Sequence, residues 1–253
     1  MTKRIYIDAG HGGTDCGAVN GTRKEANDVL KMALKVADCL KGQNCEVRLS
    51  RSNNVAKSIN QRCNDANNWG ADYFLSLHRN SGKSTATGNE IWVYSKADEN
   101  TVTKAQNILN AVCKEDGLKN RGVKKGAVSY SDYGVNKYTK MPASLLELGF
   151  ISNSGDNRAL DNKFNAIALA IAKALLKAVN VDWKNSTINN TGSYLVKVTA
   201  DTLNIRKGAG ASYTIVGEIT DKGTYTIVDT VGDWGKLKSG AGYIPLKYTE
   251  KVK

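Results

Sequence analysis

The first 179 residues alternate short apolar runs of strand type with stretches whose apolar residues recur at helical spacing. The strand-type runs are RIYID (4–8), CEVRLS (45–50), DYFLSL (72–77), EIWVY (90–94) and PASLLELGF (142–150). The helical stretches cover 24–40, 58–69 and 101–115, and a long helical stretch follows residue 150 with apolar positions from Phe164 to Ala178. Strands that alternate with helices pack in layers around a largely parallel sheet. The sequence therefore predicts an α/β fold for residues 1–179.

The composition changes after residue 179. Residues 180–193, NVDWKNSTINNTGS, are rich in Asn, Ser and Thr without apolar periodicity, which predicts a linker. Residues 194–253 then contain short strand-type runs separated by glycine turns, such as YLVKVT, TLNIR and TYTIVDTV. Many short strands in so small a segment favour a small all-β barrel. We therefore expect two domains, 1–179 and 194–253, joined by a linker.

The chain is strongly basic, with a formal net charge of +12 and a pI near 9.4. Such a balance favours an anionic partner: nucleic acid, a membrane surface or an acidic cell-wall polymer. No segment approaches the ~18 consecutive apolar residues that a membrane span needs. The N-terminus, MTKRIYID, lacks the apolar core of an export signal. We therefore expect a protein without a membrane span that is made in the cytoplasm.

The sequence contains two histidines, and each lies at the end of a predicted strand. His11 follows RIYID in the glycine-rich segment IDAGHGG, and His78 follows DYFLSL. Open α/β sheets place their ligand sites at the carboxyl ends of strands, so both imidazoles can reach one crevice. Either histidine alone is best explained as a surface or core residue, whereas the pair favours a shared site. The glycines around His11 let its loop approach that site closely.

Two glutamates are candidates to complete such a site. Hydrolytic metal sites combine imidazoles with a carboxylate and leave one position open for water. Glu25 opens the helix after the His11 loop, but its spacing alone is better explained by the preference of helix N-termini for acidic residues. Glu147 interrupts the apolar strand SLLELGF, where a buried carboxylate needs a partner. That partner could be a metal-bound water or an arginine, and the pattern alone does not decide between them.

Four blocks of the chain, in order, resemble the zinc-dependent N-acetylmuramoyl-L-alanine amidases of the type-3 family. This family includes autolysins, sporulation enzymes and phage endolysins. The blocks are IDAGHGG with Glu25 after it, SLHRN, Gly88-Asn89-Glu90 and PASLLELGFISN, and together they cover roughly residues 3–178. The resemblance implies a twisted mixed sheet flanked by helices. It also implies that His11, Glu25 and His78 bind Zn²⁺ and that Glu147 is the catalytic glutamate.

The chain departs from the family pattern at two positions. Ala9 stands where the family usually has proline, and Arg79 stands where it commonly has alanine. Arg79 either contacts substrate or points away from the site, and it is kept as a candidate substrate-binding residue. Asn80 matches the family, so we expect it to order the loop and to contribute to substrate binding.

The C-terminal segment resembles the bacterial Src-homology-3-like domains of cell-wall hydrolases. The order of TLNIR, a glycine turn, a lysine-glycine hairpin and DWGKLKSGAGYI carries this resemblance. Tyr213, Trp234 and Tyr243 are candidates for a wall-binding aromatic surface, although one aromatic often fills the core of so small a barrel.

The resemblance implies hydrolysis of the amide between the lactyl group of N-acetylmuramic acid and L-alanine in peptidoglycan. Without the resemblance, the residues alone predict only metal-assisted hydrolysis of an amide. Because no export signal is found, we expect a phage or prophage endolysin that acts at the wall after release from the host cytoplasm. Anionic wall polymers are an expected further partner, since they would attract the basic chain.

Two other functions are alternatives to this one. A cysteine peptidase that cleaves within the stem peptide would need a thiolate activated by histidine, and Cys16 and Cys63 are available. The five cysteines form no CxxC pair, and without an export signal they are expected to be reduced. A non-enzymatic binder of wall or nucleic acid would fit the charge. However, no basic helix or stacked-aromatic motif for nucleic acid is present.

Overall fold

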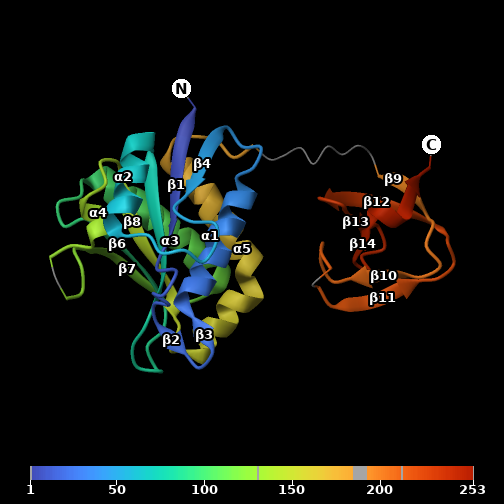
Figure 1. Ribbon diagram of the computed structural model, residues 1–253, viewed down its shortest axis with the longest axis horizontal. Coiled ribbons are helices and arrows are strands. Elements are labelled where there is room, and N and C mark those ends of the chain that lie inside the picture. Colours follow the sequence, from blue (N-terminus) through green and yellow to red (C-terminus); the bar gives the residue numbers. More distant parts are fainter. Residues whose placement is uncertain (1, 130, 185–192, 212, 253) are drawn as a thin grey trace. The chain divides into compact units, whose positions relative to one another are not determined.

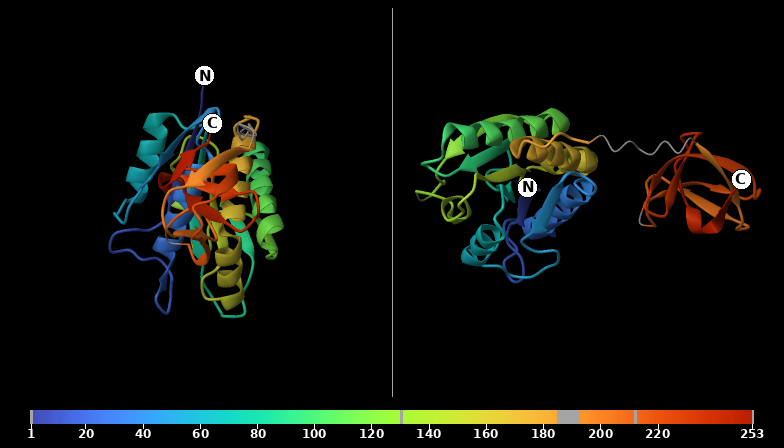
Figure 2. Two further views of the ribbon diagram at one scale, coloured as in Figure 1. Left: turned by 90° about the vertical axis from the view of Figure 1, so that its right-hand side faces the viewer. Right: turned by 90° about the horizontal axis from the view of Figure 1, so that it is seen from above.

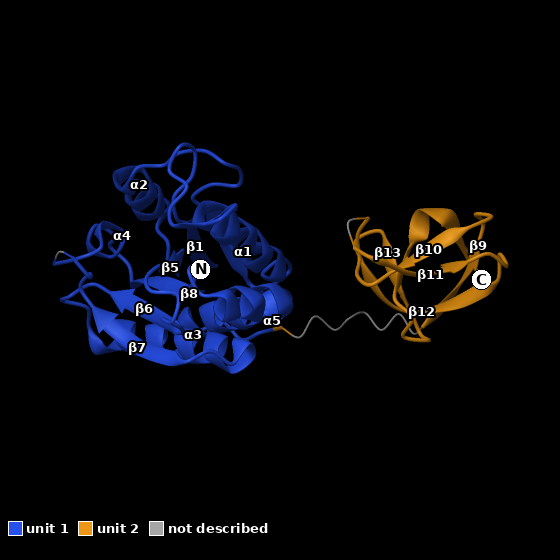
Figure 3. Cartoon of the chain, turned by 90° about the horizontal axis from the view of Figure 1, so that it is seen from below, with its two compact units in different colours: residues 1–183 blue, residues 184–253 orange. Residues whose placement is uncertain are grey.

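The computed structural model describes residues 2–129, 131–184, 193–211 and 213–252 (Figure 1). The chain divides into two compact units, Met1–Trp183 and Lys184–Lys253 (Figure 3). Residues 185–192 of the predicted linker 180–193 lie outside the described residues.

The first unit is built on a six-stranded sheet in the order β4-β1-β5-β8-β6-β7. Strands β4, β1, β5 and β8 are parallel, β6 runs antiparallel to β8, and β7 is parallel to β6. The predicted α/β fold with a mostly parallel sheet is therefore confirmed. The strand bounds are β1 Lys3–Ala9, β4 Cys45–Leu49, β5 Tyr73–Asn80, β6 Asn89–Val93, β7 Asn120–Lys125 and β8 Ala143–Phe150.

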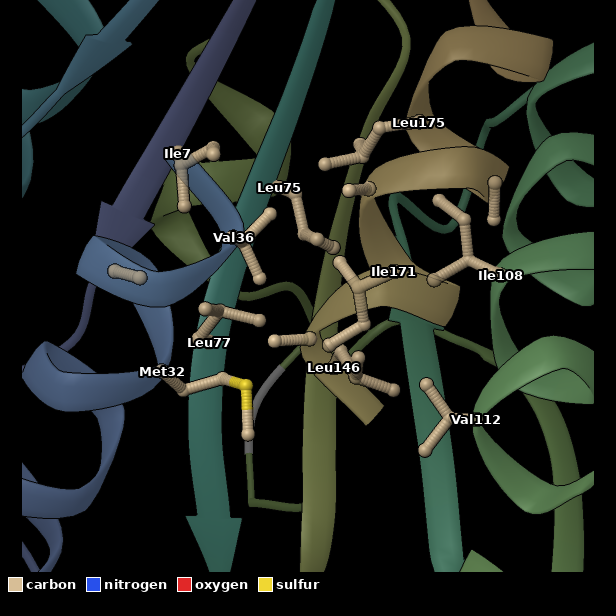
Figure 4. Packing of buried hydrophobic residues seen from close by; sticks show 14 of the residues in the cluster. Ile7, Met32, Val36, Leu75, Leu77, Ile108, Val112, Leu146, Ile171 and Leu175 are labelled. Carbon is tan, nitrogen blue, oxygen red and sulfur yellow. The ribbon is translucent and has the colours of Figure 1, made fainter. Parts of the chain in front are cut away.

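Helices cover both faces of this sheet (Figure 2). Helices α1 (Glu25–Cys39), α3 (Glu99–Asp116) and α5 (Ser154–Ala178) pack on one face. Their apolar stripes form the main core with residues of β1, β5, β6 and β8, including Ile7, Leu77 and Leu146 (Figure 4). Helices α2 (Ile59–Trp69) and α4 (Gly134–Lys137) pack on the other face around a second cluster that contains Tyr6, Phe74 and Trp92.

Side-chain hydrogen bonds explain where two helices begin. Ser58 begins α2 with a reciprocal capping box, in which its hydroxyl accepts from the Gln61 N–H and the Gln61 side chain accepts from the Ser58 N–H. Helix α5 begins ten positions before Phe164, the first apolar residue of the predicted helical pattern, because Asn153 Oδ1 accepts from the N–H groups of Gly155 and Asp156. This Asn cap lies in a polar stretch that apolar periodicity does not detect.

Four elements of the first unit were not expected from the sequence. These are the hairpin of β2 (Val19–Asn20) and β3 (Arg23–Lys24), the edge strand β7 and the short helix α4. Strand β7, NRGVKK, has one apolar residue, so no alternation marks it. Its pairing with β6 supplies the stability that its own side chains lack.

The second unit is a seven-stranded antiparallel sheet in the order β11-β10-β14-β13-β12-β9-β15. Its strands are β9 Tyr194–Val198, β10 Leu203–Arg206, β11 Ile215–Ile219, β12 Thr224–Val231, β13 Trp234–Leu237, β14 Tyr243–Pro245 and β15 Thr249–Lys251. Eight buried aliphatic residues, among them Val196, Ile227 and Ile244, form its own core. The all-β character expected for this segment is therefore confirmed, and the strands pair antiparallel.

Candidate metal centre

The candidate site lies at the carboxyl edge of the parallel strands β1, β5 and β8. His11 follows β1, His78 lies near the end of β5, and Glu147 lies in β8 as the register partner of His78. Glu25 is the first residue of α1, which the β2–β3 hairpin places at this same edge. Four residues that are far apart in sequence therefore meet where parallel strands end.

Glu25 connects the two histidines. Its Oε1 lies 3.1 Å from His11 Nε2 and 2.9 Å from His78 Nδ1. The two imidazole rings are 4.8 Å apart and nearly perpendicular, at 75°. One ligand atom from each of the three residues lies within 4.8 Å of the others. The three side chains can therefore bind one ion together.

Negative charge is concentrated in this cluster. The Glu25 side chain is 5% exposed, and burial alone would raise its pKa, but hydrogen bonds with both imidazoles hold the pKa well below its usual value. For His11 the effects are opposite: burial alone would lower the pKa of the imidazole, but its contacts with Glu25 and Asp15 raise that pKa to about 9. The surroundings thus favour positive charge at the position between the imidazoles.

Asp15 is a site residue that the sequence analysis missed. Its Oδ2 lies 2.8 Å from His11 Nδ1, and its Oδ1 accepts from the Gly17 N–H. The carboxylate therefore orients the His11 ring and leaves Nε2 to face Glu25, as carboxylates behind metal-binding histidines do. Its place four residues after His11, in the segment GGTDCG, was the available signal.

Two buried arginines, also missed, hold the backbone of the His11 loop. Arg62 donates to the carbonyls of Ala9 and His11, at 2.7 Å each, and binds the buried Asp8 carboxylate. Arg51 donates to the Ala9 carbonyl at 2.9 Å and the Gly10 carbonyl at 2.7 Å. The carbonyl groups of this loop receive donors in this way, which stabilises the conformation of the loop.

The loop approaches the site as closely as the backbone permits. A Cβ atom on Gly10 would lie 2.4 Å from Cε1 of His78, so only glycine fits there. His11 itself has a φ of 59°, in the left-handed region that residues other than glycine rarely adopt. Such strain is found at functional sites whose surroundings hold it in place.

Glu147 is buried in the strand without a polar partner for one of its oxygens. Its Oε2 has no hydrogen-bond partner in the described part of the chain, and the residue is 9% exposed. Burial raises the pKa of Glu147 to about 7, with His78 opposing that rise. Among the described residues no arginine pairs with it, so the arginine alternative is not supported. A carboxyl group with such a pKa can accept and return a proton near neutral pH.

Arg79 turns away from the site. Its side chain is fully buried and donates to Asp28 Oδ2 at 2.6 Å and to Asn157 Oδ1 at 2.7 Å, on the face covered by α1 and α5. Of the two alternatives for Arg79, the structure places its side chain away from the metal-binding cluster, because neighbouring residues of a strand point to opposite faces. Its backbone N–H contributes instead, by donating to Glu25 Oε1 at 2.9 Å.

Asn80 faces the site and orders the loop after β5. Its Oδ1 accepts from the Ser81 N–H, and its Nδ2 donates to Glu90 Oε1. It also lines a cavity of about 400 Å³ that contains the whole cluster. The apolar wall of this cavity is formed by Ile59, Val135 and Leu145, with Tyr133 beside them.

The thiols considered for nucleophilic catalysis lie in other settings. Cys16 Sγ donates to the Gly17 carbonyl, and Cys63 Sγ lies 3.8 Å from the Gly134 carbonyl. Cys63 is buried, which raises its pKa to about 11. Among the described residues neither thiol is hydrogen-bonded to a histidine, so neither has the activating base that a cysteine peptidase requires.

Of the three aromatic candidates of the second unit, Trp234 lines a groove in the described part of the chain. The groove has a volume of about 450 Å³ and is also lined by Arg206, Lys247 and Tyr248. In the described part of the chain, Tyr213 and Tyr243 are not among the residues that line it. Tyr213 is 42% exposed, and a Cβ on Gly208 would lie 2.5 Å from its ring, so it packs closely over that glycine.

The donor set of the first unit fits a catalytic zinc ion. Two imidazole nitrogens and one carboxylate oxygen are the ligands of such sites, which leave a position open for water. The unpartnered Glu147 carboxyl beside them supplies the base that metal-assisted hydrolysis uses. The same residues fit calcium or magnesium poorly, since those ions prefer oxygen ligands.

Comparisons with known proteins agree on a single family. The Amidase_3 family, described as N-acetylmuramoyl-L-alanine amidase, matches residues 5–177. The N-acetylmuramoyl-L-alanine amidase CwlM of Bacillus licheniformis is 34% identical over 206 residues, which are 79% of each chain. The endolysin of Bacillus phage SPP1 is 33% identical over 215 residues, covering 84% of this chain and 70% of that protein.

Solved structures show the same relationship. The catalytic domain of CwlV, an N-acetylmuramoyl-L-alanine amidase from Bacillus (Paenibacillus) polymyxa var. colistinus, has a TM-score of 0.65 at 33% identity and covers 71% of this chain and 99% of its own. An N-acetylmuramoyl-L-alanine amidase from Clostridium difficile 630 has a TM-score of 0.65 at 30% identity and covers 71% and 97%.

Proposed function

Since the chain belongs to the Amidase_3 family of N-acetylmuramoyl-L-alanine amidases, we propose that it is a zinc-dependent hydrolase of the amide between the lactyl group of N-acetylmuramic acid and L-alanine. The convergence of His11, Glu25 and His78 beside the unpartnered carboxyl of Glu147 is the observation that carries this proposal. The fold alone would not support this proposal, because proteins with the same fold can catalyse many different reactions.

His11, Glu25 and His78 would hold the zinc ion. When bound, the ion supplies Lewis acidity, which makes water acidic near neutral pH and polarises a carbonyl. Asp15 keeps the His11 ring in position, and Arg51 and Arg62 keep its loop in the conformation that presents Nε2.

Glu147 would handle the proton. Its carboxylate accepts a proton from the attacking water and returns it to the amine of the departing L-alanine. Burial and the lack of a competing hydrogen bond on Oε2 suit it to both steps, since neither ionisation state is strongly favoured near neutral pH.

The second unit would bind the wall as a Src-homology-3-like module, with Trp234 and Tyr248 in its groove as contacts. A weak second site on the same chain raises the local concentration of the first unit on an insoluble polymer. The similarity to the phage SPP1 endolysin supports a lytic role after release from the host cell. None of the helices in the described ranges has both the length and the apolarity needed to cross a bilayer.

The test is digestion of purified sacculi by the intact protein, with and without a zinc chelator, followed by mass spectrometry of the new termini. Free N-terminal L-alanine that disappears with the chelator and returns with zinc supports the amidase. New amino groups within the stem peptide, insensitive to the chelator but blocked by alkylation, would instead identify a cysteine peptidase.

A further inference from the structure

Arg121 and Lys124, on the edge strand β7, present two cations on the face of the sheet that carries Glu147. Arg121 Nε and Lys124 Nζ each lie 2.7 Å from the same oxygen, Glu90 Oε2. Glu90 is the register partner of Glu147 in the antiparallel pairing of β6 with β8. The two cations therefore lie at the same end of the sheet's strands as the metal-binding cluster.

A β-bulge gives both side chains this direction. Between the register pairs Asn89–Asn120 and Ile91–Val123, strand β7 contains one residue more than β6. Gly122 lies in this bulge with a φ of 87°, which a side chain would oppose. In a regular strand, residues three apart point to opposite faces, and the extra residue removes that difference.

Aromatic rings hold both cations in place. The Arg121 guanidinium lies 5.0 Å from the centre of the Phe150 ring, and Lys124 Nζ lies 5.0 Å from that of Trp92. Such contacts restrict long side chains that would otherwise be mobile, so a ligand has less entropy to remove.

The charges at this place do not balance. Glu90 is 3% exposed, and its other oxygen accepts from Asn80 Nδ2 and Trp92 Nε1, so it offers one negative charge to two cations. Arg121 and Lys124 are 31% and 34% exposed. One cation would be enough to neutralise Glu90, and the second leaves a net positive charge that faces solvent and can attract an anion.

The spacing matches a short peptide. Strand β7 is two strands away from β8, which is about 10 Å at ~4.8 Å per strand. An extended peptide advances ~3.3 Å per residue, so the second residue beyond a bond cleaved at Glu147 comes within reach of these long side chains. We propose that Arg121 and Lys124 form a carboxylate-binding subsite for the second residue of the stem peptide. This inference rests on the amidase function proposed above.

The test compares two soluble substrates with the full chain. One is N-acetylmuramoyl-L-alanine extended by glutamate with free carboxylates, and the other carries the same residue as carboxamides. We expect kcat/KM to favour the carboxylate about tenfold, mainly through KM, as for one charge-assisted hydrogen bond. The preference should weaken as salt is added.

Arg121→Gln and Lys124→Gln should each remove most of this preference, while each keeps one cation for Glu90. Lys114→Gln is the matched control, because Lys114 is exposed in α3 on the opposite layer and the net charge changes equally. Binding of the two compounds to the Glu147→Gln variant, measured by calorimetry, gives the same comparison without turnover.

Equal kcat/KM for the two substrates, or a preference that survives in both subsite variants, overturns the subsite and leaves the amidase function standing. If the calorimetry shows equal affinities as well, the same conclusion holds without reference to catalysis. If neither the soluble substrates nor sacculi are cleaved when zinc is present, both the proposed function and the proposed subsite are wrong.

Discussion

Oε1 of Glu25 lies 2.9 Å from Nδ1 of His78, although 53 residues separate them in the chain. The first residue of α1 is thereby tied to the end of β5, and the same oxygen also faces His11. Removing the charge of Glu25 would therefore affect both imidazoles at once. This makes Glu25 the most informative position at which to test metal binding.

Glu25→Gln keeps the size of the side chain but removes the anionic oxygen between the histidines. We expect zinc affinity to fall by more than the about 10- to 100-fold typical of residues that only orient ligands. Competition with a chromophoric chelator measures this directly. Glu46→Gln, at an exposed carboxylate paired with Arg4, is the control and should bind zinc as the wild type does. Unchanged affinity in Glu25→Gln would remove Glu25 from the ligand set.

Glu147→Gln separates proton transfer from metal binding. The rate of amide hydrolysis should fall about 100- to 10,000-fold, the usual contribution of general acid–base catalysis. Zinc content should remain at one ion per chain if the other three residues hold it, which atomic absorption can measure. Wild-type lytic activity in this variant would exclude Glu147 as the proton carrier.

The meeting of the two histidines could be predicted from the sequence because strand ends of a parallel sheet share an edge. For His11 and His78 the argument needs only local strand patterns and that topology. The choice between a helix-dipole role and a site role for Glu25 needed the tertiary structure. The hairpin of β2 and β3 determines which way the start of α1 faces, and two-residue strands leave no periodic signal.

The residues that hold the site's loop and the neighbouring cations could not be predicted either, because no side-chain pattern in the sequence marks their contacts. Arg51 and Arg62 act on carbonyl groups, which every residue has, so no side-chain pattern marks their partners. The common direction of Arg121 and Lys124 depends on a single extra residue in β7, which changes register without changing composition. The opposite direction of Arg79 follows from strand alternation once the face of His78 is known.

Arg51→Lys tests whether the arginine fork orders the His11 loop. Lysine cannot replace donations to the carbonyls of Gly10 and Ala26, which are 2.7 and 2.8 Å from Arg51 Nη2. We expect a loss of about 2–4 kcal/mol in the free energy of unfolding, from buried carbonyls left without donors. Zinc affinity should fall about tenfold as the loop loosens. Arg48→Lys, at a surface ion pair, serves as the control in both urea denaturation and chelator competition.

Glu90→Gln tests the pH dependence of the ion pairs beside the subsite. Burial alone would raise the pKa of Glu90, but Arg121 and Lys124 hold it below its usual value of 4.5. A depressed carboxyl pKa stabilises the fold above the unfolded pKa, and this contribution is lost as the pH falls through the folded pKa. Glu90→Gln should therefore cost about 1–2 kcal/mol at pH 7, allowing for solvent screening of the cations, and less as the pH falls through the lowered pKa of Glu90. A penalty independent of pH would show that the ion pairs contribute nothing to stability.

Alkylation distinguishes a metal-dependent amidase from a thiol enzyme. Burial raises the pKa of the Cys63 thiol to about 11, so at pH 7.5 it is almost entirely protonated and shielded from reagent. Iodoacetamide should therefore leave Cys63 unmodified in the folded protein, and mass spectrometry of peptides can establish this. Lytic activity should survive treatment, and a Cys16→Ala, Cys63→Ala variant should keep it too, because neither thiol is hydrogen-bonded to a histidine in the described chain. Loss of activity that follows modification of Cys16 in the wild type, without loss of zinc, would return the cysteine peptidase to consideration.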